Sequence, residues 1–262
     1  MTRMTAACAA ILLALLAPAA RAQSRNDFNW SGTIAAGHWI SIYNLNGPVK
    51  FERGTSDKVE VTATKHGNDD DNYVRFESHK YGPNDQDVVI CALWGENQSC
   101  DEDGTHGHNS GNHRGREVWV EFTVSVPANV RVAAHTVNGD VRVDGAGSEV
   151  EAASVNGSVD VSSSGGPVNA ETVNGSVRAA MGHFALNSDL NFSSVNGSVV
   201  AEFSDDVNAD VDLSTVNGRF LTDFPVTISG RIDPKHLRAR LGNGGPRIHM
   251  ATVNGNVELR KR

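Results

Sequence analysis

Three histidines and three carboxylates lie close together in the segment DEDGTHGHNSGNHRG, which spans residues 101–115. Imidazole nitrogens are preferred ligands of zinc and copper, so His106, His108 and His113 are the candidate metal ligands of this chain. Their spacing matches no recognised ligand pattern, and the segment is rich in glycine and asparagine. A polar loop that binds nothing therefore explains the same residues, and the sequence predicts no other cofactor.

No catalytic signature accompanies this loop. The chain contains no G-x-S-x-G, H-E-x-x-H or G-x-x-x-x-G-K motif. Enzymes that cleave polysaccharides need carboxylates clustered on one face, whereas Asp140 and Asp160 lie at different offsets from the repeats described below. We therefore expect that the protein is not an enzyme, and a polysaccharide-active enzyme is the weaker alternative.

Two cysteines, Cys91 and Cys100, lie outside the N-terminal segment. An even pair in an exported chain is typical of a disulfide, and a loop of this length would gain about 2–3 kcal/mol from closure. A redox pair would be expected to have the spacing C-x-x-C, which is absent. The sequence therefore predicts a structural disulfide.

Residues 1–22 have the pattern of a secretory signal peptide. Arg3 precedes an apolar run that extends from Ala6 to Ala20, and Ala20-Arg21-Ala22 resembles a cleavage site. This run is shorter than the roughly 20 residues that span a bilayer, and no later segment is apolar enough to do so. We predict an exported protein without a transmembrane segment.

The charge of the chain excludes one class of partner. Its formal net charge is −8, and removal of Arg3 and Arg21, with no acidic residue, makes the mature chain −10. Nucleic acids and anionic lipid surfaces attract basic proteins. We therefore expect no nucleic-acid partner.

A short phrase, Ser or Thr followed by Val-Asn-Gly, occurs six times, and a looser Leu-Asn-Gly copy occurs earlier. The asparagines of the seven copies are Asn46, Asn138, Asn156, Asn174, Asn196, Asn217 and Asn254. The residues six before, four before and three after these asparagines are apolar. This period of two on both sides of Asn-Gly predicts a strand, a tight corner and a second strand in each unit.

Two all-β arrangements fit these units. In an antiparallel meander, each Asn-Gly would be a hairpin turn. In a β-solenoid, equivalent strands would stack in parallel about 4.8 Å apart, and the asparagine amides could form a hydrogen-bonded ladder. Asp-Gly or Gly-Gly would serve a hairpin equally well, so asparagine in every copy favours a β-solenoid of about 18–22-residue coils. Asn217 would then stack on Asn196, and the 37-residue gap before Asn254 would be about two coils.

The chain divides into a repeat region and a less regular N-terminal region. We predict a β-rich cap or first coils over residues 23–130, with two polar loops, and the repeat solenoid over 131–262, in one continuous domain. The ends should differ from the middle, because open strand edges allow end-to-end self-association. The residues directly after the glycines vary and are interpreted as a solvated row: Asp140, Ser158, Ser176, Ser198, Arg219 and Asn256.

Basic residues concentrate near the C-terminus. Charged end coils explain them, and a docking face for an acidic polymer is the alternative. The residues are Arg231, Lys235, Arg238, Arg240, Arg247, Arg260, Lys261 and Arg262.

The order of these features resembles the bacterial putative-adhesin family. The resemblance rests on the early NLNG, the segment DVVICALW with a second cysteine soon after, VEFTVSVPANVRVAAHTVNGDVRV, the serial [ST]VNG units and the closing LGNGGPRIHMATVNGNVELR. It covers roughly residues 28–260 and implies a β-helix-like domain in the periplasm or outside the cell. It also implies an interaction with an envelope or surface component, either protein or glycan. A metal- or glycan-binding periplasmic protein that uses the histidine- and aspartate-rich loops is the alternative function.

Overall fold

The computed structural model describes residues 27–67, 73–107, 118–182, 186–228 and 233–262, so the predicted signal peptide lies outside the described residues. The described chain is all-β, with no α-helix and one short 3-10 helix, η1 (Pro83–Asp85). No helix in these residues is long and apolar enough to cross a membrane.

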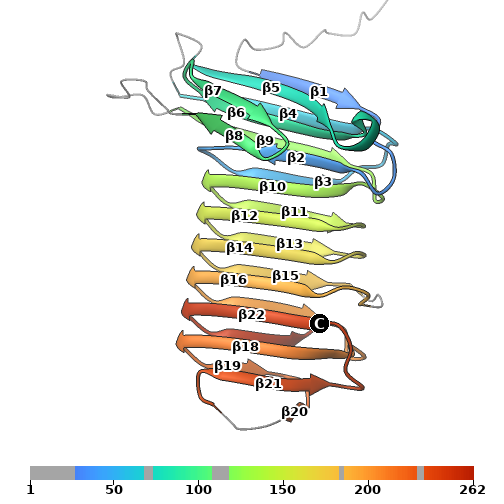
Figure 1. Cartoon of the computed structure of the whole chain (residues 1–262), viewed down its shortest axis with the longest axis vertical. Coiled ribbons are helices and arrows are strands. Elements are labelled where there is room, and N and C mark those ends of the chain that lie inside the picture. Colours follow the sequence, from blue (N-terminus) through green and yellow to red (C-terminus); the bar gives the residue numbers. More distant parts are fainter. Residues whose placement is uncertain (1–26, 68–72, 108–117, 183–185, 229–232) are drawn as a thin grey trace, which may run out of the picture.

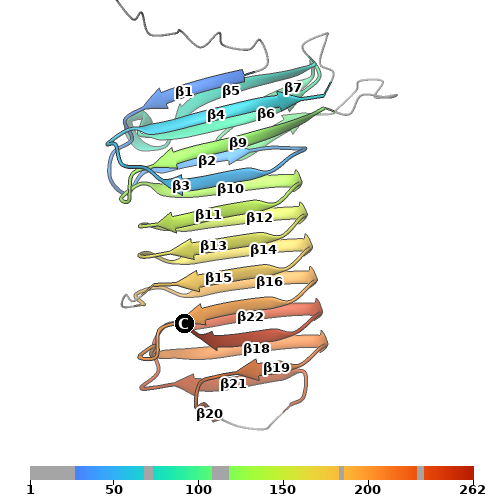
Figure 2. The same cartoon turned by 180° about the vertical axis from the view of Figure 1, so that it is seen from behind.

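Two large mixed sheets face each other along the molecule (Figures 1 and 2). The ten-stranded sheet A contains, in spatial order, β1 (Asp27–Gly32), β4 (Val59–His66), β9 (Trp119–Val126), β3 (Val49–Arg53), β11 (Val141–Ala146), β13 (Val159–Ser163), β15 (Val177–Met181), β17 (Val199–Phe203), β23 (Val257–Lys261) and β19 (Phe220–Thr222). The eleven-stranded sheet B contains β20 (Thr227–Ile228), β21 (His236–Leu241), β18 (Ala209–Asn217), β22 (Arg247–Asn254), β16 (Leu190–Asn196), β14 (Val168–Asn174), β12 (Val150–Asn156), β10 (Arg131–Asn138), β2 (Trp39–Tyr43), β6 (Asp87–Trp94) and β5 (Val74–Tyr81). A separate hairpin consists of β7 (Gln98–Asp101) and β8 (Gly104–Gly107).

Each Asn-Gly corner joins a strand of sheet B to a strand of sheet A. Strand β12, for example, leads through the corner into β13, and it pairs in parallel with β10 and β14 so that Val150 lies opposite Val132 and Val168. The strands that flank a corner therefore lie in different sheets. The antiparallel hairpin alternative is wrong for the repeats, because none of the corner asparagines has the positive φ that a type I′ turn requires.

The core lies between the two sheets. The alternate residues of each repeat strand point inward, as the period of two requires, and the row six residues before the corner asparagines is at most 3% exposed. Burial of each such aliphatic side chain contributes about 1.5–3 kcal/mol. The row consists of Val132, Val150, Val168, Leu190, Val211 and Ile248.

The C-terminal unit is not the last unit of the stack. Strand β22 pairs in parallel with β16 on one side and β18 on the other (Figure 1). In sheet A, β23 lies between β17 and β19. The expectation that Asn217 stacks on Asn196 is therefore wrong, because Asn254 lies between them. The long gap before Asn254 contains β20 and β21. Strand β21 covers the far side of β18 in antiparallel pairing, so in sheet B the last unit occupies the position between β16 and β18.

The first unit lies next to the later repeats although Asn46 and Asn138 are 92 positions apart in the sequence. Strands β2 and β3 flank the Asn46 corner and pair in parallel with β10 and β11. The intervening residues extend both sheets: β9 and β4 lie beyond β3, and β6 and β5 lie beyond β2. Both sheets thus run continuously from the N-terminal region into the repeats.

Candidate functional site

Six corner asparagines, called here the Asn ladder, hydrogen-bond to one another through their side chains. Nδ2 of Asn156 donates to Oδ1 of Asn138 at 2.9 Å. The same bond, at 2.7–2.8 Å, runs from Asn174 to Asn156, Asn196 to Asn174, Asn254 to Asn196 and Asn217 to Asn254. An amide can donate and accept at once, whereas a carboxylate only accepts. Asn46 differs, since its Nδ2 donates to the carbonyl oxygen of Val118 at 2.7 Å.

The Ser or Thr of the phrase ties each unit to its neighbour. Thr172 Oγ1 donates to the Gly157 carbonyl at 2.7 Å, and Ser194 Oγ donates to the Gly175 carbonyl at 2.8 Å. Glycine is required because a Cβ on Gly175 would lie 2.1 Å from the Gly157 carbonyl oxygen. The valine points outward, and Val173 is 40% exposed. The phrase is therefore explained by contacts within the stack.

The residues after the glycines also join the units. The side-chain oxygen of Asp140 accepts the backbone N–H of Ser158 at 2.8 Å, and Ser158 Oγ accepts that of Ser176 at 3.3 Å. The series continues through Ser198 and Asn256 to the backbone of Arg219. These residues are exposed or partly exposed, as expected for a solvated row, but they are not interchangeable. Each member except Arg219 has a short oxygen-bearing side chain, and Arg219 belongs to the end unit, where no further repeat unit follows.

The predicted metal ligands are only partly placed. His106 lies on β8, and its Nε2 is 2.7 Å from Asp101 Oδ1. His108 and His113 lie outside the described residues. Within the residues that the structure describes, no group of three or more His, Cys, Asp or Glu side chains is arranged to hold a metal ion.

The predicted disulfide is present between Cys91 on β6 and Cys100 on β7, with a Cα–Cα distance of 5.9 Å. It attaches the β7–β8 hairpin to the outer face of sheet B, where the two cysteines pack with Val89 and Leu93 and against Tyr43. Structural disulfides are typical of proteins that fold outside the reducing cytoplasm.

A stacked pair of rings lies beside this hairpin. The rings of Tyr43 and His135 are 4.6 Å apart and nearly parallel. Gly104 of the hairpin approaches Tyr43 so closely that a Cβ would lie 2.6 Å from the ring. Burial raises the pKa of Tyr43 and lowers the pKa of His135 to about 4. At neutral pH both rings are therefore uncharged, and the pair contributes packing to this face of the sheet.

Three ion pairs lie close together at the other end of sheet B. A hollow of about 340 Å³, called here the arginine basin, lies over β18, β21 and β22 and contains Arg238, Arg240, Arg247, Asp210 and Asp212. Arg240 Nε is 3.1 Å from Asp210 Oδ1, and Arg238 Nε is 3.4 Å from Asp212 Oδ2. No carboxylate among the described residues forms an ion pair with the Arg247 side chain.

His236 lies beside the basin and contacts one of its carboxylates, with Nε2 2.6 Å from Asp212 Oδ1. Partial burial alone would raise the pKa of Asp212, but the hydrogen bond to His236 and the charges of His236, Arg238 and His249 hold this pKa below its usual value. Asp212 is therefore ionised at neutral pH, and three guanidinium groups face two carboxylates.

Sequence reasoning found the arginines but not their arrangement. The antiparallel pairing of β21 with β18 and the insertion of β22 bring Arg238, Arg240 and Arg247 together. Other members of the predicted basic cluster lie on sheet A, where Arg260 pairs with Glu258 and Lys261 pairs with Asp205. Arg231 lies outside the described residues. The cluster is therefore not one surface.

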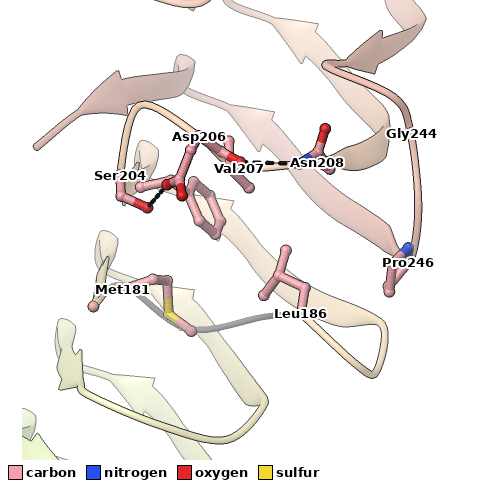
Figure 3. A pocket seen from close by; sticks show the side chains of 10 residues that line it. Met181, Leu186, Ser204, Asp206, Val207, Asn208, Gly244 and Pro246 are labelled. Atoms are coloured by element: carbon pink, nitrogen blue, oxygen red, sulfur yellow. Dashed lines mark hydrogen bonds between the residues drawn. The ribbon is translucent and has the colours of Figure 1, made fainter.

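A second hollow, of about 380 Å³, lies at the unit ends opposite the Asn-Gly corners (Figure 3). Met181, Leu186 and Phe203 supply apolar walls. Ser204 Oγ donates to Asp206 Oδ1 at 2.8 Å, and Asn208 Nδ2 donates to the Asp206 carbonyl at 3.0 Å. Asn208 Oδ1 also accepts the backbone N–H of Asn243 at 2.7 Å, which joins this loop to the turn after β21. No residue predicted as a metal ligand or disulfide partner lines the hollow.

Comparison with known proteins shows a likeness of fold. No family model and no curated protein matches the chain. Among solved structures, a putative cell adhesion protein from Clostridium sporogenes aligns at 10% identity with a TM-score of 0.53, over 90% of this chain and 100% of that chain. A putative adhesin from Bacteroides fragilis aligns at 10% identity with a TM-score of 0.32, over 91% of this chain and 98% of that chain. At this identity the first likeness shows the fold alone, and the second is too low to support an inference.

Proposed function

We propose that this chain is a non-catalytic, exported protein that binds an anionic component of the bacterial envelope or cell surface. The observation that carries the proposal is the arginine basin, in which the Arg247 side chain has no carboxylate partner among the described residues. Guanidinium groups bind carboxylate and phosphate through paired hydrogen bonds. A concave site with one unpaired guanidinium therefore suits an acidic polymer.

The rest of the molecule increases the selectivity of this site. The chain carries a net charge of −8, so an anion is repelled by most of the surface. Within the basin, Asp210 and Asp212 hold the side chains of Arg240 and Arg238 in place. The ion pairs thus leave Arg247 as the group that meets the ligand first.

The absence of catalysis is part of the proposal. It is supported by the lack of a catalytic motif in the sequence. Turnover of an acidic polysaccharide would overturn it.

The fold-level proposals follow from the stacking. Parallel units joined corner to corner have the architecture of a β-solenoid, and the in-register Asn ladder supports this description. Membership of the putative-adhesin family is supported by the order of the motifs and by the likeness of fold to a putative cell adhesion protein.

The disulfide supports a location in the periplasm or at the cell surface. The edge strands β19 and β20 are short, which limits the surface available for end-to-end self-association.

A sedimentation assay tests the function. The purified protein is mixed with isolated envelope fractions and, separately, with immobilised polygalacturonate as a polycarboxylate probe. We expect binding that weakens with salt and falls at least about tenfold, equivalent to about 1.4 kcal/mol, in the variant Arg238→Gln/Arg247→Gln. The matched control is Arg142→Gln/Arg178→Gln, which removes the same charge from sheet A. Equal losses in both variants, or no binding by the wild type, would contradict the proposal.

The metal-binding alternative keeps one supporting observation, the pairing of His106 with Asp101. Calorimetric titration with zinc, copper and calcium, repeated on a His106/His108/His113 triple-alanine variant, tests it. Heat that disappears in the variant would support a metal site, and no heat for any ion would end this alternative.

A further inference from the structure

The chain contains the reactive dipeptide Asn-Gly eight times. Seven copies are the corners, which allow a comparison within a single molecule, and the eighth is Asn243-Gly244 in the turn after β21. In an Asn-Gly pair, the backbone nitrogen of glycine can lose its proton to hydroxide and attack Cγ of the asparagine. The Cγ–Nδ2 bond breaks, ammonia leaves, and a five-membered succinimide forms. Water then opens either C–N bond of the ring to give aspartate or isoaspartate. Glycine favours the reaction because it lacks a Cβ that would hinder the approach.

In most copies the attacking nitrogen is engaged in the stack. The backbone N–H of each glycine donates to the carbonyl oxygen of the corner asparagine in the next unit, at 2.7–3.2 Å. This bond must break before the nitrogen can react. The glycines so engaged are Gly47, Gly139, Gly157, Gly175, Gly197 and Gly255.

The attacked side chain is also held in most copies. An interior member of the Asn ladder, such as Asn174, donates through Nδ2 to Asn156 and accepts through Oδ1 from Asn196. Rotation of Cγ toward the following nitrogen breaks both bonds. Asn46 is held differently, by its bond to the Val118 carbonyl, and Gly47 beside it is buried.

The copy at Asn217-Gly218 lacks these restraints because it ends the stack. No acceptor for the Gly218 N–H and no donor to Asn217 Oδ1 occurs among the described residues, and the remaining bond is from Asn217 Nδ2 to Asn254. Gly218 is also exposed, whereas the glycines of the other six copies are buried or partly buried. Each hydrogen bond that need not be broken accelerates the reaction by about two- to tenfold.

We propose that Asn217 is the site of spontaneous deamidation among the seven corner Asn-Gly pairs of the folded protein and that the other six corner pairs are protected by the stack. At the eighth pair, outside the stack, the Gly244 N–H is engaged by the Leu241 carbonyl at 3.0 Å. Asn254 is the next most reactive position, since the Gly255 N–H bond at 3.2 Å depends on the end unit alone. Deamidation of Asn217 adds a negative charge at the exposed end of the ladder. It also removes the hydrogen bond that Asn217 Nδ2 donates to Asn254 Oδ1, because a carboxylate does not donate.

Peptide mapping by mass spectrometry tests the proposal on the wild-type chain. The folded protein and a urea-unfolded sample are incubated side by side at mildly alkaline pH. Aspartate plus isoaspartate is quantified over time at the seven corner positions and, separately, at Asn243. The unfolded sample corrects for the effect of neighbouring residues. We expect the folded-to-unfolded rate ratio at Asn217 to exceed that at Asn138, Asn156, Asn174 and Asn196 by at least about tenfold.

Two outcomes would overturn the proposal. Similar folded-to-unfolded rate ratios at Asn217 and at the interior copies would show that the hydrogen bonds of the stack do not slow deamidation. A highest ratio at Asn254 would place that unit, rather than Asn217, at the exposed end of the stack, so the same experiment also reports on the order of the units.

Discussion

Asn254 donates a hydrogen bond to Asn196 across 2.7 Å although 58 residues separate them in the chain. Asn217, which is only 21 residues from Asn196 in the sequence, lies one unit further away, beyond Asn254. The last unit of the chain is thus an interior unit of the stack. Its hydrogen bonds on both sides connect the C-terminus to strands β16 and β18.

This order predicts which asparagine substitutions are coupled. Asn196→Asp and Asn254→Asp place two carboxylates at adjacent positions, so the double variant should lose about 1 kcal/mol more unfolding free energy than the single variants summed. Urea unfolding of the two single variants and the double variant measures this coupling.

The pair Asn196→Asp and Asn217→Asp is the matched control. These positions are separated by the whole unit of Asn254, so their effects should add to within about 0.5 kcal/mol. Coupling in this pair and none in the first would mean that the units stack in sequence order.

Two neighbouring serines test the hydroxyl bonds of the repeat. Ser194→Ala removes the buried donor to the Gly175 carbonyl and should lower the unfolding free energy by about 1–2 kcal/mol. Ser193 lies next to it and points to the outer face, so Ser193→Ala should change stability by less than about 0.5 kcal/mol. Chemical denaturation of both variants gives the comparison. Equal changes would show that burial of the hydroxyl has no effect.

Removal of the disulfide should destabilise the N-terminal region. The variant Cys91→Ala/Cys100→Ala opens a loop with a sequence separation of 9 and should lose about 2–3 kcal/mol. Thermal unfolding with and without reductant measures the effect. Reductant should lower the unfolding temperature of the wild type and leave that of the variant unchanged. A wild type insensitive to reductant would contradict the prediction.

His135 should make stability depend on pH in a defined window. Its pKa is lowered from 6.5 in the unfolded chain to about 4 in the fold, so the unfolded state binds more protons between these values. The contribution of the neutral His135 ring to the free energy of unfolding is therefore present above about pH 6.5. It is lost as the pH falls toward about 4, which lowers the free energy of unfolding by about 1–3 kcal/mol.

Comparison with His135→Phe isolates this effect, because phenylalanine retains a ring against Tyr43 but does not titrate. The difference in unfolding free energy between wild type and variant should shrink or reverse from pH 7 to pH 4. Parallel pH profiles would contradict the assignment. The carboxylates titrate in both proteins, so their effect on stability cancels in the difference between the two unfolding free energies.

Local features of the sequence determined the repeating unit. The alternation around each Asn-Gly pair predicts two strands, since inward-facing residues such as Val150 must be apolar while outward-facing ones such as Glu151 need not be. The use of asparagine in every copy favoured parallel stacking over hairpins, and the in-register pairing of the units follows from it. The cysteine pair was identified because only two cysteines lie beyond the N-terminal segment.

Only the tertiary structure decided which units are neighbours. Every unit presents the same corner chemistry, so the phrase around Asn217 would match that of Asn196 as well as that of Asn254, and a local pattern cannot choose between them. The order of the units depends on β21, which pairs in antiparallel fashion with the far edge of β18. The other edge of β18 then pairs with β22, so the last unit lies between β16 and β18. The arginine basin and the exposed Asn217 corner both result from that arrangement, because each is formed by residues that the chain brings together only when the stack is complete.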